Sequence, residues 1–140
     1  MSGVSPEQEN VRIVKEMYSA FDRGDIPAII DKLADDVEFC INSIVTDVPW
    51  YGIHKGPAAV RDRFFGSIAK EADVRVFERK DFIASGNQVV VTWHGEYTLK
   101  RNGKKVLQEG AHLWTFNPKG KVSRYRGFVD TAADQAAWRG

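Results

Sequence analysis

Apolar residues recur every three or four positions in three stretches of the first half of the chain, which is the spacing of one buried helix face. We predict helices over residues 5–22, 25–34 and 57–69. Ser5, Pro6 and Gln8 match a helix start, with a capping side chain, a proline in the first turn and a glutamine three residues after the cap. Gly24 ends the first helix and Asp25 can cap the second, so we expect the two helices to pack as a hairpin.

Elsewhere the apolar period changes to two, which indicates strands whose side chains alternate between two faces. We predict strands over residues 36–42, 72–83, 87–101, 104–117 and 120–130. Asn102 and Gly103, between two of these runs, are a strong hairpin signal. Residues 43–55 show no clear period and are interpreted as a loop. Helices followed by an antiparallel set of strands predict a single α+β domain, residues 1–140, whose helices cover one face of the sheet.

Alternation along the predicted strands separates inward-facing from outward-facing side chains. His94 falls on the outward, polar face of its strand. His112 shares a face with Gly110 and Trp114, so it is the titratable group that alternation places among aromatic residues. Because imidazole changes charge near neutral pH, His112 is the first candidate acid or base. A buried neutral histidine satisfied by one hydrogen bond is the alternative.

Asn42, at the end of the first predicted strand, is the second candidate catalytic residue, because its amide can orient a carbonyl group or a water molecule. A cap of a helix or loop is the alternative role for this side chain. Aromatic residues and a few neighbours are expected to form the walls of an apolar ligand pocket. The predicted substrate-binding residues are Tyr18, Trp50, Tyr51, His54, Trp93, Tyr97, Trp114, Tyr125 and Val129.

Charge and composition disfavour several classes of function. The 140 residues are 43% hydrophobic and carry 20 basic and 19 acidic side chains, for a formal net charge of +1. No strong field is therefore available to attract nucleic acid or anionic lipid. The chain shows no apolar run long enough to span a bilayer and no signal-peptide pattern, so we expect a cytoplasmic protein. The single cysteine, Cys40, has no partner for an internal disulfide, which fits a reducing compartment.

Sequence motifs for a metal site, an organic cofactor or a serine nucleophile are also missing. The chain has no glycine-rich dinucleotide loop, no Walker loop, no serine nucleophile elbow and no His-Glu-x-x-His pair. Its 3 histidines lie far apart in the sequence, which gives a metal site no support. We therefore expect neither a metal nor a cofactor.

Five segments carry a family pattern in their order and spacing: residues 18–25, 33–37, 56–60, 116–122 and 128–132. Together they resemble the SnoaL-like and ketosteroid isomerase-like branch of the nuclear transport factor two-like superfamily, over nearly the whole chain. This resemblance implies a cystatin-like α+β cone, in which a curved mixed or antiparallel sheet wraps around three helices and encloses a pocket. It also implies a homodimer formed through the sheet face.

The catalytic residues of ketosteroid isomerases do not carry over to this chain. Placed by the same segments, their tyrosine falls on Met17, their base near Ile41 or Asn42, and their protonated aspartate on His112. Two functions stay open. The first is a cofactor-independent isomerase, cyclase or hydrolase that moves a proton on a small, apolar, carbonyl-like molecule. The second is a non-catalytic ligand-binding or dimerisation module of the same fold.

Overall fold

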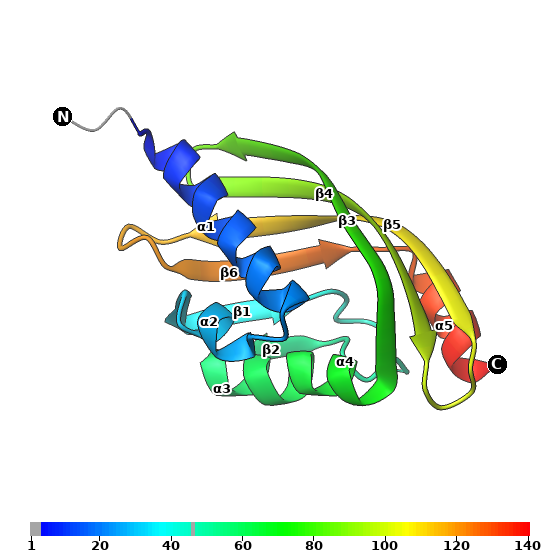
Figure 1. Ribbon diagram of the computed structural model, residues 1–140. Coiled ribbons are helices and arrows are strands. Elements are labelled where there is room, and N and C mark those ends of the chain that lie inside the picture. The colour runs from blue at the N-terminus through cyan, green and yellow to red at the C-terminus, as the bar shows by residue number, and fades with distance from the viewer. Residues whose placement is uncertain (1–3, 46) are drawn as a thin grey trace.

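The computed structural model describes residues 4–45 and 47–140, and its helices pack against one curved sheet (Figure 1). The helical segments are α1 (Pro6–Asp22), α2 (Ile26–Ile30), α3 (Pro57–Ala59), the π-helical η1 (Val60–Phe65), α4 (Gly66–Glu71) and α5 (Thr131–Arg139). The strands are β1 (Leu33–Cys40), β2 (Ile53–Lys55), β3 (Ala72–Ser85), β4 (Gln88–Leu99), β5 (Lys105–Phe116) and β6 (Val122–Phe128). The predicted α+β class is confirmed. Residues 1–3 and 46, which fall within the predicted domain of residues 1–140, lie outside the described residues.

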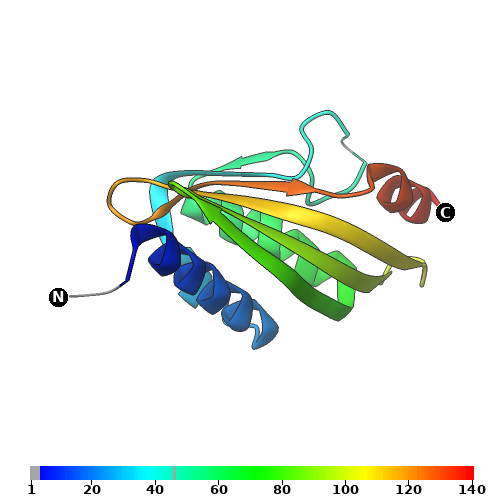
Figure 2. The same ribbon diagram turned by 90° about the horizontal axis from the view of Figure 1, so that it is seen from above.

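The described strands form one six-stranded sheet in the order β2-β1-β6-β5-β4-β3. Strands β3 to β6 make an antiparallel meander, whereas β1 runs parallel to β6. Figure 2 shows α1 along one side of the sheet and α5 beyond the ends of the long strands. The sheet is therefore mixed, and its curvature leaves a concave face for the helices.

The first helix begins as its sequence predicts. The Ser5 hydroxyl accepts the backbone N–H of Gln8 at 3.1 Å, and the Gln8 side chain accepts the backbone N–H of Ser5 at 3.0 Å. This reciprocal capping box satisfies two N–H groups that a helix start leaves unpaired. One face of α1 is buried, and it brings Met17 and Tyr18 against the sheet.

The second predicted helix, residues 25–34, is too long. α2 ends at Ile30, and Leu33 already pairs with Val122 as the first residue of β1. Asp25 caps α2 as predicted, because its carboxylate accepts a backbone N–H of the first turn at 3.2 Å. Leu33 is buried at the spacing expected of a helix face, but it is buried as part of the sheet. The predicted helix was therefore extended beyond the observed end of α2.

The third predicted helix, residues 57–69, extends to Glu71 and contains the π-helical segment η1 in its middle. Such wide turns are frequent at functional sites. Here the segment buries Phe64 and Phe65, whose ring centroids lie 5.0 Å apart, toward the sheet. The wide turn thus places two adjacent aromatic residues inside the concave face.

Two elements escaped prediction, although the predicted strands end within three residues of the observed ones. β2 has only 3 residues and pairs with β1 at the edge of the sheet. α5 begins after Asp130, whose carboxylate caps it by accepting the backbone N–H of Ala133 at 3.1 Å. A helix, α5, therefore follows the last predicted strand.

The inner and outer faces of the sheet follow the predicted alternation. Val89 and Val91 are fully buried on the inner face of β4, while His94 on the outer face makes a 3.0 Å hydrogen bond to Glu96. Both faces of β5 carry apolar groups, yet Leu107 on its outer face is 63% exposed. Only the inner face of β5 is therefore well covered within one chain, and a homodimer through the sheet face stays a prediction.

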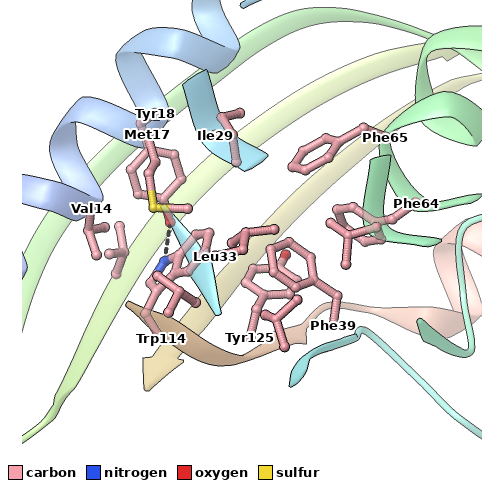
Figure 3. Close-up of a cluster of buried hydrophobic side chains, with 14 of the residues drawn as sticks. Val14, Met17, Tyr18, Ile29, Leu33, Phe39, Phe64, Phe65, Trp114 and Tyr125 are labelled. Atoms are coloured by element: carbon pink, nitrogen blue, oxygen red, sulfur yellow. Dashed lines mark hydrogen bonds between the residues drawn. The ribbon is translucent and has the colours of Figure 1, made fainter. Parts of the chain in front are cut away.

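The core lies between the concave face and the helices, and much of it is aromatic (Figure 3). Phe39 from β1 stacks on Tyr125 from β6 with ring centroids 4.5 Å apart, and Trp114 lies 4.8 Å from Tyr125. Tyr18 reaches this cluster from α1, and Figure 3 shows its hydrogen bond to Trp114. The aromatic packing continues directly into the wall of a cavity.

Candidate functional site

A cavity of about 150 Å³ opens between the concave face of the sheet and the helices. Cavities of this size lined by apolar side chains can hold a small ring compound. Most of the predicted substrate-binding residues line it, namely Tyr18, Trp50, Trp93, Tyr97, Trp114, Tyr125 and Val129. The predicted acid or base, His112, lines it as well. The two-residue period of β4, β5 and β6 is what brings these side chains to one face.

His112 is held by a chain of hydrogen bonds in the cavity wall. The indole Nε1–H of Trp114 donates to the hydroxyl oxygen of Tyr18 at 3.1 Å, and that hydroxyl lies 2.6 Å from Nδ1 of His112. Indole can only donate, and Nδ1 is the one acceptor within hydrogen-bond distance of this hydroxyl among the described residues, so the phenolic proton of Tyr18 is directed to Nδ1. A neutral imidazole that accepts at Nδ1 carries its own proton on Nε2. Nε2 has no hydrogen-bond partner among the described residues, which leaves one N–H donor for a ligand.

The surroundings of His112 keep its ring uncharged. Burial, with a smaller contribution from the positive charge of Arg79, lowers the pKa of His112 to about 3. The Arg79 guanidinium stacks 5.0 Å from the Tyr18 ring centroid and is fixed by an ion pair with Asp22 at 2.5 Å. Burial also raises the pKa of Tyr18 well above its ordinary value. Near neutral pH the pair is therefore a phenol and a neutral imidazole, which polarises a ligand better than it removes a proton.

Two glycines shape the cavity floor under Trp93. A Cβ at Gly95 would lie 2.8 Å from the Trp93 ring, and one at Gly110 would lie 2.6 Å from it. The indole therefore rests on bare backbone of β4 and β5, with its ring centroid 5.1 Å from that of His112. Side chains at these two positions would push the indole into the space that a ligand needs.

Asn42 is a correction to the predicted catalytic pair. Its side-chain oxygen accepts the backbone N–H groups of Ile44 and Val45 at 2.8 and 2.7 Å. Asn42 does not line the cavity, whereas the preceding residue, Ile41, does. The amide therefore caps the turn after β1, which is the alternative that the sequence left open.

Tyr51 and His54 are also placed differently from the prediction. Both are buried, but neither lines the cavity. His54 packs against Phe64 and lies 3.1 Å through Nε2 from the backbone oxygen of Trp50, which holds the loop together. The Tyr51 hydroxyl points to α5 and donates to Asp134. The loop has no regular period, so alternation could not assign these side chains to a face.

Asp134 is a site residue that the sequence analysis missed. This carboxylate on α5 is 4% exposed and lines the cavity. It accepts hydrogen bonds from the hydroxyls of Tyr51 and Tyr97 and from Nε2 of Gln108, the last at 2.9 Å. The signal that could have revealed it is the capping residue Asp130 followed by an alanine-rich stretch, which is typical of a helix start.

Across the part of the chain that the structure describes, no three His, Cys, Asp or Glu side chains come together as a possible metal site. Within residues 4–45 and 47–140, no helix has the length and apolar character needed to cross a membrane.

The polar groups that line the cavity form two separate sets, one around His112 and one around Asp134.

The model of the SnoaL-like domain family matches residues 14–125, and the chain belongs to this family. Among solved structures, the chain is similar to an NTF2-like protein of unknown function from Burkholderia pseudomallei, with a TM-score of 0.85, 26% identity, and coverage of 94% of this chain and 98% of that chain. An NTF2-like protein from Burkholderia xenovorans gives a TM-score of 0.83 at 28% identity, over 96% of this chain and 98% of that chain. TerC, co-crystallised with polyporic acid, gives a TM-score of 0.82 at 26% identity, over 97% of this chain and 100% of that chain. No curated protein gives a significant match to the sequence. The predicted family and its α+β fold are confirmed.

Proposed function

We propose that this protein is a cofactor-independent enzyme of the isomerase or cyclase type that acts on a small apolar carbonyl compound. The observation that carries the proposal is the hydrogen-bond chain from Trp114 through Tyr18 to His112, which leaves Nε2–H of a neutral imidazole as a fixed donor in an aromatic cavity. A carbonyl oxygen that accepts this hydrogen bond becomes more negative as an enolate forms. A donor already aimed at that oxygen stabilises the transition state by about 3 kcal/mol.

The neighbours of His112 strengthen this donor. The Tyr18 hydroxyl at Nδ1 fixes the tautomer, and successive hydrogen bonds in a chain polarise one another. The adjacent indole N–H of Trp93 is buried without an acceptor among the described residues. The proton that leaves carbon passes to water, which returns a proton to the same carbon.

One relative supports an organic ligand for a protein of this fold. TerC was crystallised with polyporic acid, and this chain shares its fold over nearly its whole length. Membership of the SnoaL-like family fits the same class of function. A non-catalytic ligand-binding module remains the second candidate, because the same aromatic cavity would serve it without any chemistry.

The test uses 2-indanone, a compact bicyclic ketone, as a probe of proton transfer next to a carbonyl. We expect the protein in D₂O to accelerate deuterium incorporation at the hydrogens beside the ketone, followed by NMR, by about a hundredfold over buffer. Binding of 2-indanone without acceleration would support the ligand-binding module instead. Absence of both binding and acceleration would contradict the proposal.

A further inference from the structure

A second polar group lies in the cavity far from His112. Gln108 and His112 share the inner face of β5 and are four residues apart, which is roughly 13 Å along a strand. Gln108 donates to Asp134 at 2.9 Å, so the Asp134 carboxylate marks the end of the cavity that α5 covers. The donor chain around His112 and this carboxylate are therefore separate binding points for different parts of a ligand.

The partners of Asp134 are all uncharged. The hydroxyls of Tyr51 and Tyr97 and the amide of Gln108 donate to it, and no ion pair between described residues includes it. Buried carboxylates are normally paired with a cation, because burial strongly disfavours an isolated charge. Burial accordingly raises the pKa of the Asp134 carboxyl, although its three hydrogen bonds oppose that shift. This carboxylate thus accepts neutral donors, and two of its three donors are phenols.

Attachment of α5 does not depend on the charge of Asp134. α5 is already attached by Gln108, which donates to the backbone oxygen of Asp130 at 2.8 Å and accepts its N–H at 2.9 Å. Asn102 adds a 2.8 Å hydrogen bond to the backbone oxygen of Ala137. An apolar side chain at position 134 would keep these attachments of α5, although the hydroxyls of Tyr51 and Tyr97 and the amide of Gln108 would lose an acceptor. The carboxylate therefore calls for a use beyond anchoring the helix.

We propose that Asp134 is a ligand-binding carboxylate and that the molecule bound in the cavity presents a hydroxyl group, phenol or alcohol, to its Oδ2 atom. An ionised carboxylate has about four acceptor positions, and three of those on Asp134 are occupied. Tyr51 takes one position on Oδ2, while Tyr97 and Gln108 both donate to Oδ1. The remaining position on Oδ2 suits one further O–H donor. An anionic group there would be repelled.

This inference rests on the proposed function only in using the same cavity, and it is tested by binding without turnover. Single-ring probes of similar shape separate the chemistry: toluene, p-cresol, benzylammonium and benzoate. Hydrogen bonds to a charged group contribute about 1.5–3 kcal/mol, which is roughly tenfold or more in affinity. At about pH 8, where p-cresol is still protonated, calorimetry should show p-cresol binding at least about tenfold tighter than toluene.

The Asp134→Asn variant should reduce this preference to less than about threefold while leaving toluene affinity unchanged. The matched control is Asp47→Asn, because Asp47 is a carboxylate that pairs with Arg139 of the same helix outside the cavity. This variant should keep the full preference for p-cresol. Equal binding of toluene and p-cresol by the unmodified protein, or a preference that survives Asp134→Asn, would overturn the proposal.

Two further measurements test the proposal if the Asp134→Asn variant fails to fold. Tyr97→Phe removes one donor and frees a position on Oδ1, so the p-cresol preference should persist or increase; its loss would assign the phenol to Tyr97 and overturn the inference. Tighter binding of benzylammonium than of p-cresol would also overturn it, in favour of a cationic ligand. A p-cresol preference without 2-indanone exchange would leave this inference standing while the proposed enzyme function fails.

Discussion

Replacing His112 by glutamine is expected to slow the exchange of the 2-indanone hydrogens by about a hundredfold, the effect of removing one well-placed donor to an oxyanion. Glutamine can still accept the Tyr18 hydroxyl through its amide oxygen, but it cannot hold an N–H where the rigid ring holds Nε2. We therefore expect kcat to fall while the affinity for 2-indanone changes little. Deuterium incorporation followed by NMR measures the rate, and circular dichroism checks the fold.

The matched control for this variant is His94→Gln. His94 lies on the outer face of the sheet, hydrogen-bonded to Glu96, and does not line the cavity. Exchange by this control should stay within about threefold of the unmodified protein. Unchanged exchange in His112→Gln would remove His112 from the mechanism, and loss of folding would make its role structural.

Replacing Gly110 by alanine is expected to lower the free energy of unfolding by about 2 kcal/mol, within the range for overpacked sites. The new Cβ would lie 2.6 Å from the Trp93 ring and 2.7 Å from the backbone oxygen of Phe128. The side chain can move, but the backbone oxygen belongs to the neighbouring strand and yields less easily. Urea unfolding measures the stability loss, and displacement of Trp93 into the cavity should also weaken p-cresol and toluene binding.

Gly66→Ala is the control, and we expect it to change the free energy of unfolding in the opposite direction or not at all. Gly66 is in the helix at φ −61, and its new Cβ would approach a backbone oxygen no closer than 3.4 Å. Alanine in a helix is favoured over glycine by up to about 1 kcal/mol, so this variant should be as stable as the unmodified protein or more stable. If Gly110→Ala is equally stable, Trp93 does not rest on the backbone as described.

Most of the fold was predictable because its signals are local. The capping box of Ser5 and Gln8 involves neighbours within one turn, and the hairpin pair Asn102 and Gly103 joins two adjacent strands. Strand alternation likewise depends only on whether two residues are an even number of positions apart. For that reason it placed His112 and Trp114 together on the cavity side. The end of α2 was missed because helical spacing alone does not show whether a helix or a sheet buries Leu33.

The site was predictable only in part, because several of its contacts are made over long sequence separations. Tyr51 meets Asp134 across 83 residues, and no local pattern reports that meeting. The role of Asn42 depended on the turn that follows β1, which the aperiodic loop did not specify. The partner that fixes the tautomer of His112 also comes from far away, since Tyr18 lies 94 residues earlier on α1.

The central claim is that His112 is a neutral imidazole with its proton on Nε2, and ¹⁵N NMR of the histidine ring tests it without any substrate. With a folded-state pKa of about 3, the ring should show a protonated Nε2 and an unprotonated Nδ1, with no change from about pH 5 to about pH 8. His94 is the internal reference, because its hydrogen bond to Glu96 raises its pKa and it should titrate within the accessible range. A midpoint for His112 near its ordinary pKa of about 6.5, or a proton found on Nδ1, would contradict the account.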